Sequence, residues 1–318
     1  MNPCDLCGGT DSQFLGITYN VALRSDDHPY ELRQCRGCGC IFTDMSRVSA
    51  AADYYTDGYY SFRPYGTKMA QDGQVRVERP EKLLDVGCGS GEWLFQQQLQ
   101  GHEVWGLDAD ARAVEAARAH GLRAVREFSE LPDGYFDWVR LSHVLEHTSS
   151  PTEMMQAVGR KLTPGGRMEI LVPNADGAKF RELMPVSRVT DVPRHLYFFS
   201  EATLRRLLQK TGFTVEVITH VNVNWVVNLR EVVGDTRRLL MHRRKAKEPL
   251  LRTLGLLGKI LKVHLSPTTR AGVRKDWLYA RAHLDVVSGG GRRSPADTRL
   301  PSPAAFPGGA RQVPGSPG

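Results

Sequence analysis

Three glycines alternate across five positions directly after an apolar segment, and this turn constrains the fold more than any other feature of the chain. Residues 83–91 read Leu-Leu-Asp-Val-Gly-Cys-Gly-Ser-Gly, with the glycines at Gly87, Gly89 and Gly91. Because glycine has no Cβ, such a turn can bend sharply and bring its backbone close to a ligand. In an open α/β sheet, a nucleotide-like cofactor lies at the carboxyl end of the first strand. The turn therefore predicts a Rossmann-like α/β sheet with a cofactor site at that edge.

The spacing within the turn favours one kind of cofactor. A dinucleotide-binding turn has the pattern G-x-G-x-x-G, whereas this turn reads G-x-G-x-G, with Asp85 two residues before Gly87. The difference points away from a pyrophosphate. It favours a cofactor whose amino-acid end carries a cation, which Asp85 can face directly or through water. On the turn alone, an ordinary strand–helix connection stays open.

A second acidic residue follows at the spacing of a ribose-binding group. After a helix expected at about 92–100, residues 104–107 form a strand that ends in Asp108, 17 residues past Gly91. A carboxylate about 20 residues beyond the turn accepts the ribose hydroxyls of a nucleotide. Residues 111–120 then read as an alanine-rich helix.

These elements resemble the class I S-adenosylmethionine (SAM) dependent methyltransferases. Residues 85–91 resemble motif I of that superfamily. The run from Leu131 to Asp137, followed by Ser-His-Val-Leu-Glu-His at 142–147 and by Pro151, resembles its "LPxxxFD…HVLEH…P" stretch. The resemblance covers about residues 81–220. It implies a seven-stranded sheet whose last two strands are antiparallel, with strands at 213–218 and 276–284.

The resemblance also implies which residues hold SAM. Glu127 and Phe128 occupy the positions that usually hold the adenine, although a glutamate replaces the commoner aspartate there. His143 follows the fourth strand and is expected to line the cofactor. The full expected SAM site is Asp85, Gly87, Gly89, Gly91, Asp108, Glu127, Phe128 and His143.

Two C-x-x-C-G knuckles near the amino terminus form a second constellation. Each can direct two thiolates at one tetrahedral ion, so the pair predicts a closed zinc site in a zinc-ribbon-like module. The 27 residues between the knuckles exceed the usual ribbon spacing, and we expect a β-hairpin there, at about 12–18 and 30–34. Two disulfides and redox catalysis stay open, but the lack of a signal peptide and the duplicated knuckle favour metal. The expected ligands are Cys4, Cys7, Cys35 and Cys38.

Charge is distributed unevenly. Residues 221–318 carry 18 Lys and Arg against 6 Asp and Glu, whereas residues 1–220 carry 24 against 29. The basic isoelectric point is therefore a property of the carboxyl third. We expect a zinc module at 1–48, a tyrosine-rich cap or linker at 49–80 and a methyltransferase domain at 81–287. A basic insertion at 221–275 interrupts that domain, and the Gly, Pro and Ser-rich segment 288–318 is expected to be disordered.

Within the insertion, large aliphatic residues recur at helical spacing, with Arg252 and Lys259 on the opposite face. They are Leu250, Leu251, Leu254, Leu257, Ile260, Leu261 and Leu265. One interpretation is a helix packed on the protein or on a second subunit. The second is a basic amphipathic helix, within 237–265, that contacts an anionic membrane surface. The third is a helix that contacts nucleic acid. No apolar run is long enough to span a membrane. We expect a cytoplasmic protein, with a peripheral place at the inner membrane surface under the second interpretation.

Two histidines are candidates for the chemistry. The segment 191–200 resembles the "PRHLYFFS" stretch of bacterial methyltransferases of polysaccharides and secondary metabolites. If the acceptor is a hydroxyl, a base must take its proton, and His195 is the first candidate. His147 is expected to line the acceptor cavity. A purely structural role stays open for both, such as a cap on Ser200 for His195.

The sequence therefore predicts a zinc-bearing SAM-dependent methyltransferase of a small molecule, a sugar or a lipid-linked glycan. An RNA methyltransferase that grips RNA through its zinc module and a non-catalytic subunit with a SAM fold are the alternatives. The acidic body and the absence of an "NPPY" or "DPPY" tetrapeptide disfavour nucleic acid as the partner. The oligomeric state is not readable from the sequence.

Overall fold

A computed structural model of the chain describes residues 3–20, 28–48, 77–187, 189–221, 229–246, 249–265 and 276–285. Residues 1–285 form one compact unit. The expected tyrosine-rich linker lies outside the described residues except for 77–80, and the expected tail at 288–318 lies wholly outside them.

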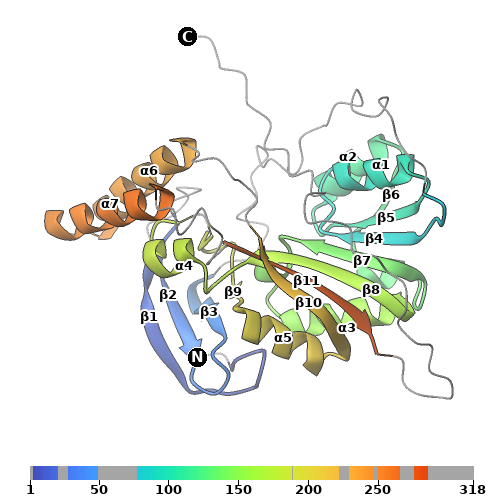
Figure 1. Ribbon diagram of the computed structural model, residues 1–318, viewed down its shortest axis with the longest axis horizontal. Helices are drawn as coiled ribbons and strands as arrows, with labels where there is room; N and C mark the ends of the chain where they lie inside the picture. The colour runs from blue at the N-terminus through green and yellow to red at the C-terminus, as the bar shows by residue number, and fades with distance from the viewer. Residues whose placement is uncertain are drawn as a thin grey trace, which may run out of the picture. The chain divides into compact units, whose positions relative to one another are not determined.

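A seven-stranded sheet forms the centre of this unit, with the strand order β10-β11-β8-β7-β4-β5-β6 (Figure 1). The strands β4 to β8 run parallel, and β11 is antiparallel to both β8 and β10. The predicted α/β sheet and its antiparallel last pair are therefore confirmed. The strands are β4 (Lys82–Val86), β5 (Glu103–Leu107), β6 (Arg123–Val125), β7 (Phe136–Ser142), β8 (Leu162–Pro173), β10 (Phe213–Val221) and β11 (Trp277–Leu284).

Helices cover both faces of this sheet, because its central strands are apolar on both sides. In β4, Leu83 packs with residues of α1 (Glu92–Leu99) and α2 (Ala111–Ala119). Leu84 and Val86 point to the other face and belong to the cluster formed with α3 (Pro151–Lys161) and α5 (Glu201–Lys210). The two helix pairs are seen on opposite faces of the sheet in Figure 1. Short 3-10 helices follow β6, at Phe128–Glu130, and β7, at Leu145–His147.

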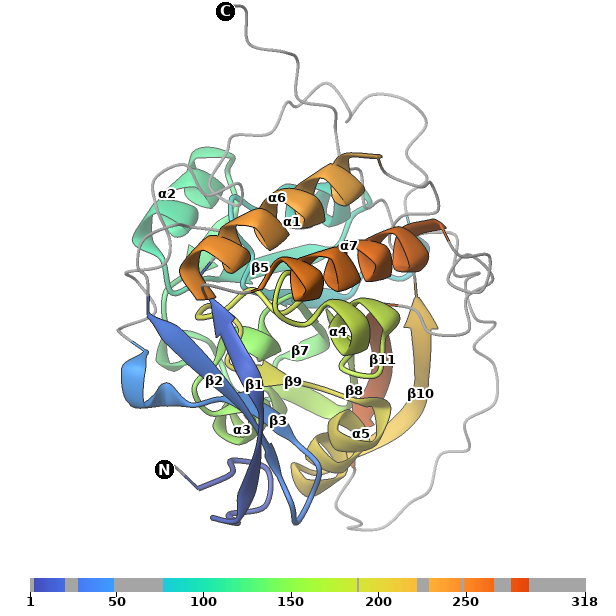
Figure 2. The ribbon, with the colours of Figure 1, turned by 90° about the vertical axis from the view of Figure 1, so that its left-hand side faces the viewer.

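The amino-terminal residues form a separate four-stranded sheet in the order β1-β2-β3-β9 (Figure 2). The strands β1 (Ser12–Tyr19) and β2 (Pro29–Cys35) are the predicted antiparallel hairpin. The third strand is β3 (Ile41–Thr43), and a 3-10 helix follows it at Met45–Arg47. The fourth, β9 (Tyr197–Phe198), comes from the segment that carries His195, and it pairs with β3 through Ile41 and Phe198. A strand from far along the chain therefore completes the cysteine-bearing sheet.

The basic insertion folds into two helices, α6 (Leu229–Ala246) and α7 (Leu250–Leu265), beside the short α4 (Ala178–Leu183). The expected helix at 250–265 is present, and its apolar residues divide between a buried and an exposed environment. Ile260 and Val263 are buried against α4 and α6, whereas Leu251 and Leu254 are exposed. Among the described residues, no helix combines the length and the hydropathy needed to cross a membrane.

The strand β8 starts at Leu162, which pairs with Phe136 of β7 before a register shift. Ser200 caps α5 through a reciprocal pair of hydrogen bonds with Thr203, and the ring of His195 bonds elsewhere. The interpretation of His195 as a cap on Ser200 is therefore wrong.

Candidate functional site

The glycine turn after β4 is tightly packed. Gly87, Gly89 and Gly91 have φ angles of 70°, 55° and 85°, in the left-handed region that favours glycine. A Cβ at Gly87 would lie 2.3 Å from Cγ2 of Val144, and one at Gly91 would lie 2.3 Å from Cδ1 of Leu122. Larger residues are therefore disfavoured at both positions, by the left-handed backbone and by the packing of the turn against these side chains.

Asp108, at the carboxyl end of β5, is joined to the turn. Its Oδ2 accepts a hydrogen bond from the backbone N–H of Gly89 at 2.9 Å, and its Oδ1 accepts one from the N–H of Asp110 at 3.0 Å. Burial raises the pKa of Asp108, and the two backbone hydrogen bonds oppose that shift. Each carboxylate oxygen has a second lone pair. Asp108 can therefore accept two ribose hydroxyls while it still holds the turn.

Asp85 has a partner that the sequence analysis did not identify. Nη1 of Arg140 donates to both carboxylate oxygens of Asp85, at 3.0 and 3.2 Å, and the guanidinium lies 4.5 Å from the ring centroid of Trp93. Burial raises the pKa of Asp85, against the lowering effect of Arg140. The available signal was a basic residue within the apolar run of residues 138–141. Arg140 lies directly opposite Asp85 in the parallel register of β4 and β7.

The expected adenine-binding pair lies at the end of the neighbouring strand. Glu127 precedes the 3-10 helix at Phe128–Glu130, and its exposed side chain accepts a hydrogen bond from Ser129 at 3.1 Å. Phe128 is partly buried against the main core. Because β4, β5 and β6 are adjacent and parallel, the turn, Asp108 and this pair follow three neighbouring strand ends at one edge of the sheet.

A polar segment follows β7 at the same edge. His143 has a φ of 59°, which is uncommon for a residue other than glycine and tends to occur at functional sites. Its Nδ1 lies 3.3 Å from Oε1 of Glu146, and its ring makes an edge contact with Trp277 at 4.5 Å between centroids. The sequence analysis did not single out either partner.

His147 and His195 are brought together from different parts of the chain. Their ring centroids lie 4.7 Å apart, at an interplanar angle of 72°. Nδ1 of His147 lies 3.0 Å from the carbonyl oxygen of Arg194, and Nδ1 of His195 lies 3.0 Å from that of Val189. A carbonyl oxygen can only accept, so each Nδ1 carries the hydrogen, and each Nε2 of a neutral ring keeps its lone pair. Burial and the neighbouring His195 lower the pKa of His147 to about 4, so that ring is neutral at pH 7.

Glu146 completes this cluster. Its side chain is fully buried, and among the described residues its Oε2 has no hydrogen-bond partner. Burial would raise its pKa, but the hydrogen bond with His143 and the surrounding imidazoles lower it to about 2. Ligand atoms of Glu146, His147 and His195 lie within 4.8 Å of one another. A buried carboxylate and two imidazoles that converge in this way can accept a proton, orient a hydroxyl or hold a divalent cation.

The amino-terminal module contacts this cluster directly. The buried Thr43, at the end of β3, donates its hydroxyl to the carbonyl oxygen of His195 at 2.9 Å, and its N–H bonds to the carbonyl of Leu196 at 2.8 Å. At the cysteine end, the carboxylate of Asp5 accepts from the hydroxyl of Ser150 at 2.7 Å and from the N–H of Thr152 at 2.8 Å. Asp5 thus holds the start of α3, where a carboxylate is favourable.

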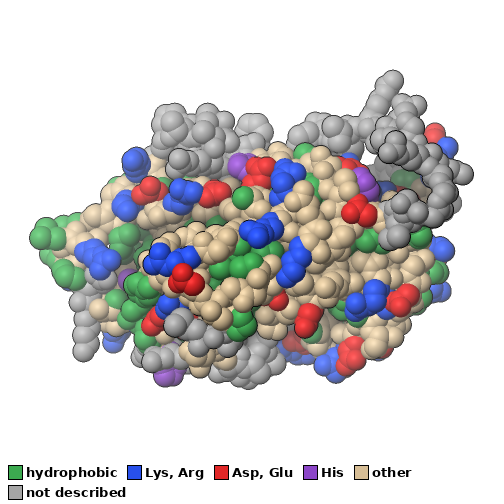
Figure 3. All heavy atoms as spheres, turned by 90° about the horizontal axis from the view of Figure 1, so that it is seen from below, with side chains coloured by type: hydrophobic (Ala, Val, Ile, Leu, Met, Phe, Trp, Pro, Cys, Tyr) green, Lys and Arg blue, Asp and Glu red, His purple; other side chains and the backbone are tan. Residues whose placement is uncertain are grey.

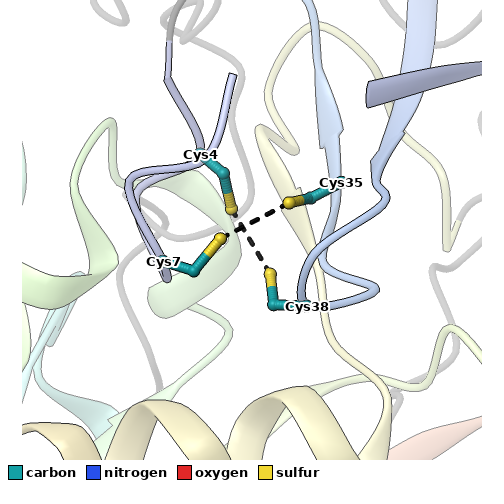
Figure 4. Close-up of side chains that lie close together, drawn as sticks. All are labelled: Cys4, Cys7, Cys35 and Cys38. Carbon is teal, nitrogen blue, oxygen red and sulfur yellow. Dashed lines mark hydrogen bonds between the residues drawn. The ribbon is translucent and has the colours of Figure 1, made fainter. Parts of the chain in front are cut away.

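The four knuckle cysteines point to a common centre (Figure 4). Sγ of Cys4 lies 3.5 Å from that of Cys38, Sγ of Cys7 lies 3.4 Å from that of Cys35, and all four lie within 4.8 Å of one another. A covalent disulfide would need about 2.05 Å, so all four are free thiols. Tetrahedral zinc with Zn–S bonds of about 2.3 Å needs sulfurs roughly 3.8 Å apart. The donor set therefore fits zinc.

Matching backbone turns shape the two knuckles. The N–H of Gly8 bonds to the carbonyl of Cys4 at 2.7 Å, and the N–H of Gly39 bonds to that of Cys35 at 2.9 Å. Both glycines have positive φ, at 73° and 78°. The glycine after each C-x-x-C pair thus supplies the left-handed conformation at the tight turn.

Comparison with known proteins gives consistent matches. Residues 63–218 match the model of a family described as a methyltransferase domain. The chain is 28% identical over 184 residues to the ubiquinone biosynthesis O-methyltransferase of Chromobacterium violaceum, covering 52% of this chain and 79% of that protein. It is 32% identical over 181 residues to the protein of the same name from Pectobacterium carotovorum, covering 47% of this chain and 76% of that protein.

Among solved structures, phosphoethanolamine N-methyltransferase 2 of Haemonchus contortus aligns with a TM-score of 0.47 at 18% identity, covering 86% of this chain and 68% of that one. This likeness is too distant to carry an argument, so the fold assignment rests on the strand order of the chain itself.

Proposed function

This chain belongs to the class I SAM-dependent methyltransferases, and from that premise we propose that it methylates a hydroxyl group of a small molecule. Sugars and lipid-linked glycans are acceptors of the expected class. Support comes from the curated relatives, which are named as O-methyltransferases of ubiquinone biosynthesis. The observation that carries the proposal is the convergence of Glu146, His147 and His195 beside the edge that holds the SAM motifs.

The family implies SAM as the cofactor, and SAM supplies an electrophilic methyl group on a sulfonium. Asp108 would hold the ribose through its free lone pairs, and Glu127 and Phe128 would hold the adenine. Asp85 would face the cationic amino-acid end from its place beside Arg140. Much of the acceleration in such a transfer comes from holding donor and acceptor together, which a packed, preformed turn favours.

His195 would act as the base in this proposal. When bound, SAM would supply the methyl group to the acceptor oxygen and would retain on its sulfur the electron pair of the broken carbon–sulfur bond. The acceptor proton would pass to Nε2 of His195, whose Nδ1–H is held by the carbonyl of Val189. His147, neutral at pH 7, can accept a hydrogen bond from the acceptor or take the same proton. Oε2 of Glu146 can accept from a second hydroxyl and so orient the acceptor.

The cysteine cluster would hold one structural zinc ion. Four thiolates leave no open coordination position for chemistry. Zinc would instead fix the module that bonds to His195 through Thr43 and to the start of α3 through Asp5. In this proposal, the metal supports the acceptor side of the site and takes no part in methyl transfer.

Labelled methyl transfer tests the proposal. The protein is incubated with SAM carrying a labelled methyl group and with extract of its source cells, and the small-molecule, lipid and RNA fractions are counted separately. We expect label in the small-molecule or lipid fraction and none in RNA. Label confined to RNA would favour the RNA methyltransferase alternative. No label in any fraction, from protein that binds SAM, would favour the non-catalytic subunit.

Two variants assign the base. His195→Gln should lower kcat by about 100-fold to 10,000-fold, the usual contribution of a general base, with SAM affinity by calorimetry unchanged. Glu127→Gln is the matched control, because it should weaken SAM without removing the base. A His195→Gln protein with wild-type kcat would refute the assignment. Loss of SAM binding in the same variant would show a structural role instead.

A further inference from the structure

The helical hairpin of α6 and α7 lies outside the segment that matches the family model, which ends at residue 218. Its outward side is unusually apolar. Among the described residues, eight large hydrophobic side chains are exposed, and six of them belong to this hairpin. Leu251 is the most exposed, at 83%. In Figure 3, hydrophobic side chains gather at the end of the hairpin on the left, with Lys and Arg side chains beside them. The six are Val233, Leu240, Leu250, Leu251, Leu254 and Leu261.

These side chains are not the ones that hold the hairpin on the protein. On α7, Ile260 and Val263 point inward and pack with Leu239 of α6 and with Leu183 of α4. The exposed positions 250, 254 and 261 recur at intervals of four and seven residues, which forms a separate stripe along the helix. The helix therefore has one apolar stripe for the protein and a second one that the described part of the chain leaves exposed.

Basic side chains share the exposed side of the hairpin with these hydrophobic residues. In α7, which contains no acidic residue, Lys262 lies on the side of Leu251, whereas Arg252 and Lys259 lie across the helix from the stripe. All three basic side chains are exposed, and Lys259 lies 3.4 Å from Glu182 of α4. In α6, Arg237 and Arg244 are exposed and share one outward row with two of the hydrophobic residues, at positions 233 and 240.

The acidic side chain described in α6 does not offset this charge at the surface. Asp235 is buried, lies 2.7 Å from Nε2 of His264 and is paired with Arg238. The outward side of the hairpin is therefore apolar and positive together.

We propose that this outward side binds the surface of an anionic lipid bilayer. A helix that lies in a membrane interface needs leucines to enter the acyl boundary and basic residues to meet anionic headgroups. A symmetric contact with a second copy of the chain would place the basic rows of the two copies against each other. A nucleic-acid surface would use the arginines, but its usual stacking partners are aromatic, and the exposed large side chains here are aliphatic.

The contacts of the hairpin connect this surface to the acceptor side of the site. Nε of Arg238 donates to the carbonyl of Val186 at 2.7 Å, and Val186 packs with α7 on the segment that leads to His195. Membrane binding would therefore place the hairpin between the bilayer and the segment that carries the proposed base, with about one helix diameter, roughly 10 Å, between them. This link between the membrane surface and the base rests on the proposed function. Such an arrangement favours a lipid-linked acceptor that stays in the membrane.

Vesicle sedimentation tests the surface independently of any methyl transfer. The whole protein is mixed with vesicles of equal parts phosphatidylglycerol and phosphatidylcholine, or of phosphatidylcholine alone. We expect sedimentation with the anionic vesicles only, and release as salt rises to about 0.15 M and beyond, where the Debye length falls to about 8 Å. Absence of sedimentation at every salt concentration would overturn the proposal, whatever the enzyme methylates.

Paired variants identify the residues. Each basic residue near such a surface contributes about fivefold to binding. Replacing Arg237, Arg244, Arg252 and Lys262 by glutamine should therefore weaken binding by about 100-fold or more. The double variant Leu251→Gln and Leu254→Gln should lose binding even at low salt.

Two matched controls should bind as the wild type does. The double variant Arg160→Gln and Arg206→Gln removes exposed charges from α3 and α5, and Phe14→Gln removes an exposed hydrophobic side chain from β1. An equal loss of vesicle binding in these controls would overturn the assignment of the lipid-binding surface to the hairpin. If the wild type dimerises but does not bind vesicles, and the leucine double variant abolishes the dimer, the outward side of the hairpin contacts a second copy of the chain. RNA binding without vesicle binding would assign it to nucleic acid.

Discussion

Replacing Thr43 by valine tests whether the cysteine-bearing module positions the proposed base. Valine has nearly the shape of threonine but no hydroxyl, so it removes the 2.9 Å hydrogen bond to the carbonyl of His195 and keeps the backbone bond to Leu196. Thr43 is fully buried, so water cannot replace the lost donor. A buried carbonyl without a partner costs about 1–3 kcal/mol.

We expect the free energy of unfolding of Thr43→Val, measured with urea, to fall by that amount. SAM affinity, measured by calorimetry, should stay within about twofold, because the SAM motifs lie on other strands. Displacement of a catalytic group by about 1 Å can cost roughly 100-fold in rate. With the acceptor found by labelled methyl transfer, kcat should therefore fall by up to that factor.

Two control variants separate the hydrogen bond from packing. Thr43→Ser keeps the hydroxyl and should keep kcat, although the lost methyl group costs about 1 kcal/mol of stability. Thr211→Val removes a 2.8 Å bond from the hydroxyl to the carbonyl of Leu207 at the C-terminal end of α5 and should leave kcat unchanged. If Thr43→Val has the wild-type kcat and its free energy of unfolding falls by less than about 0.5 kcal/mol, the module does not position His195.

Three further predictions follow from the site. Asp108→Ala should weaken the binding of SAM by about 2–4 kcal/mol, because it removes hydrogen bonds to an ionised group. Unchanged SAM affinity by calorimetry would contradict the role of Asp108 in binding the ribose. One zinc per chain should copurify with protein prepared without chelator, and Cys38→Ser should lower that content; less than a tenth of an equivalent in the wild type would refute the metal site. The pKa of His147 is about 4, below the ordinary 6.5, so the stabilisation of the fold by the neutral ring is present above pH 6.5 and is lost as the pH falls toward 4. At about 1.4 kcal/mol per pH unit, the free energy of unfolding should fall by at most about 3 kcal/mol more in the wild type than in His147→Gln. Parallel profiles of unfolding free energy against pH for the two proteins would contradict this prediction.

The family, the sheet and the cysteine cluster were all predictable from the sequence. The expected roles of the site residues, the zinc ion and the domain boundaries stay predictions. Glu146 shows the limit of the motif: the sequence analysis quoted it within the "HVLEH" run but gave it no role, because only its burial and its convergence with His195 set it apart.

Features that depend on neighbouring residues could be predicted before the fold was known. A glycine-rich turn, a C-x-x-C-G knuckle and a helical or alternating apolar pattern all act over a few positions, and their geometry follows from backbone preferences and side-chain periodicity. Which distant residues meet depends instead on how the whole chain folds. The register of β4 and β7 places Arg140 against Asp85, and the pairing of β3 with β9 joins Thr43 to His195. The division of the α7 leucines also depended on what packs against the helix, because helical spacing places residues on a face but does not say which faces another element will cover.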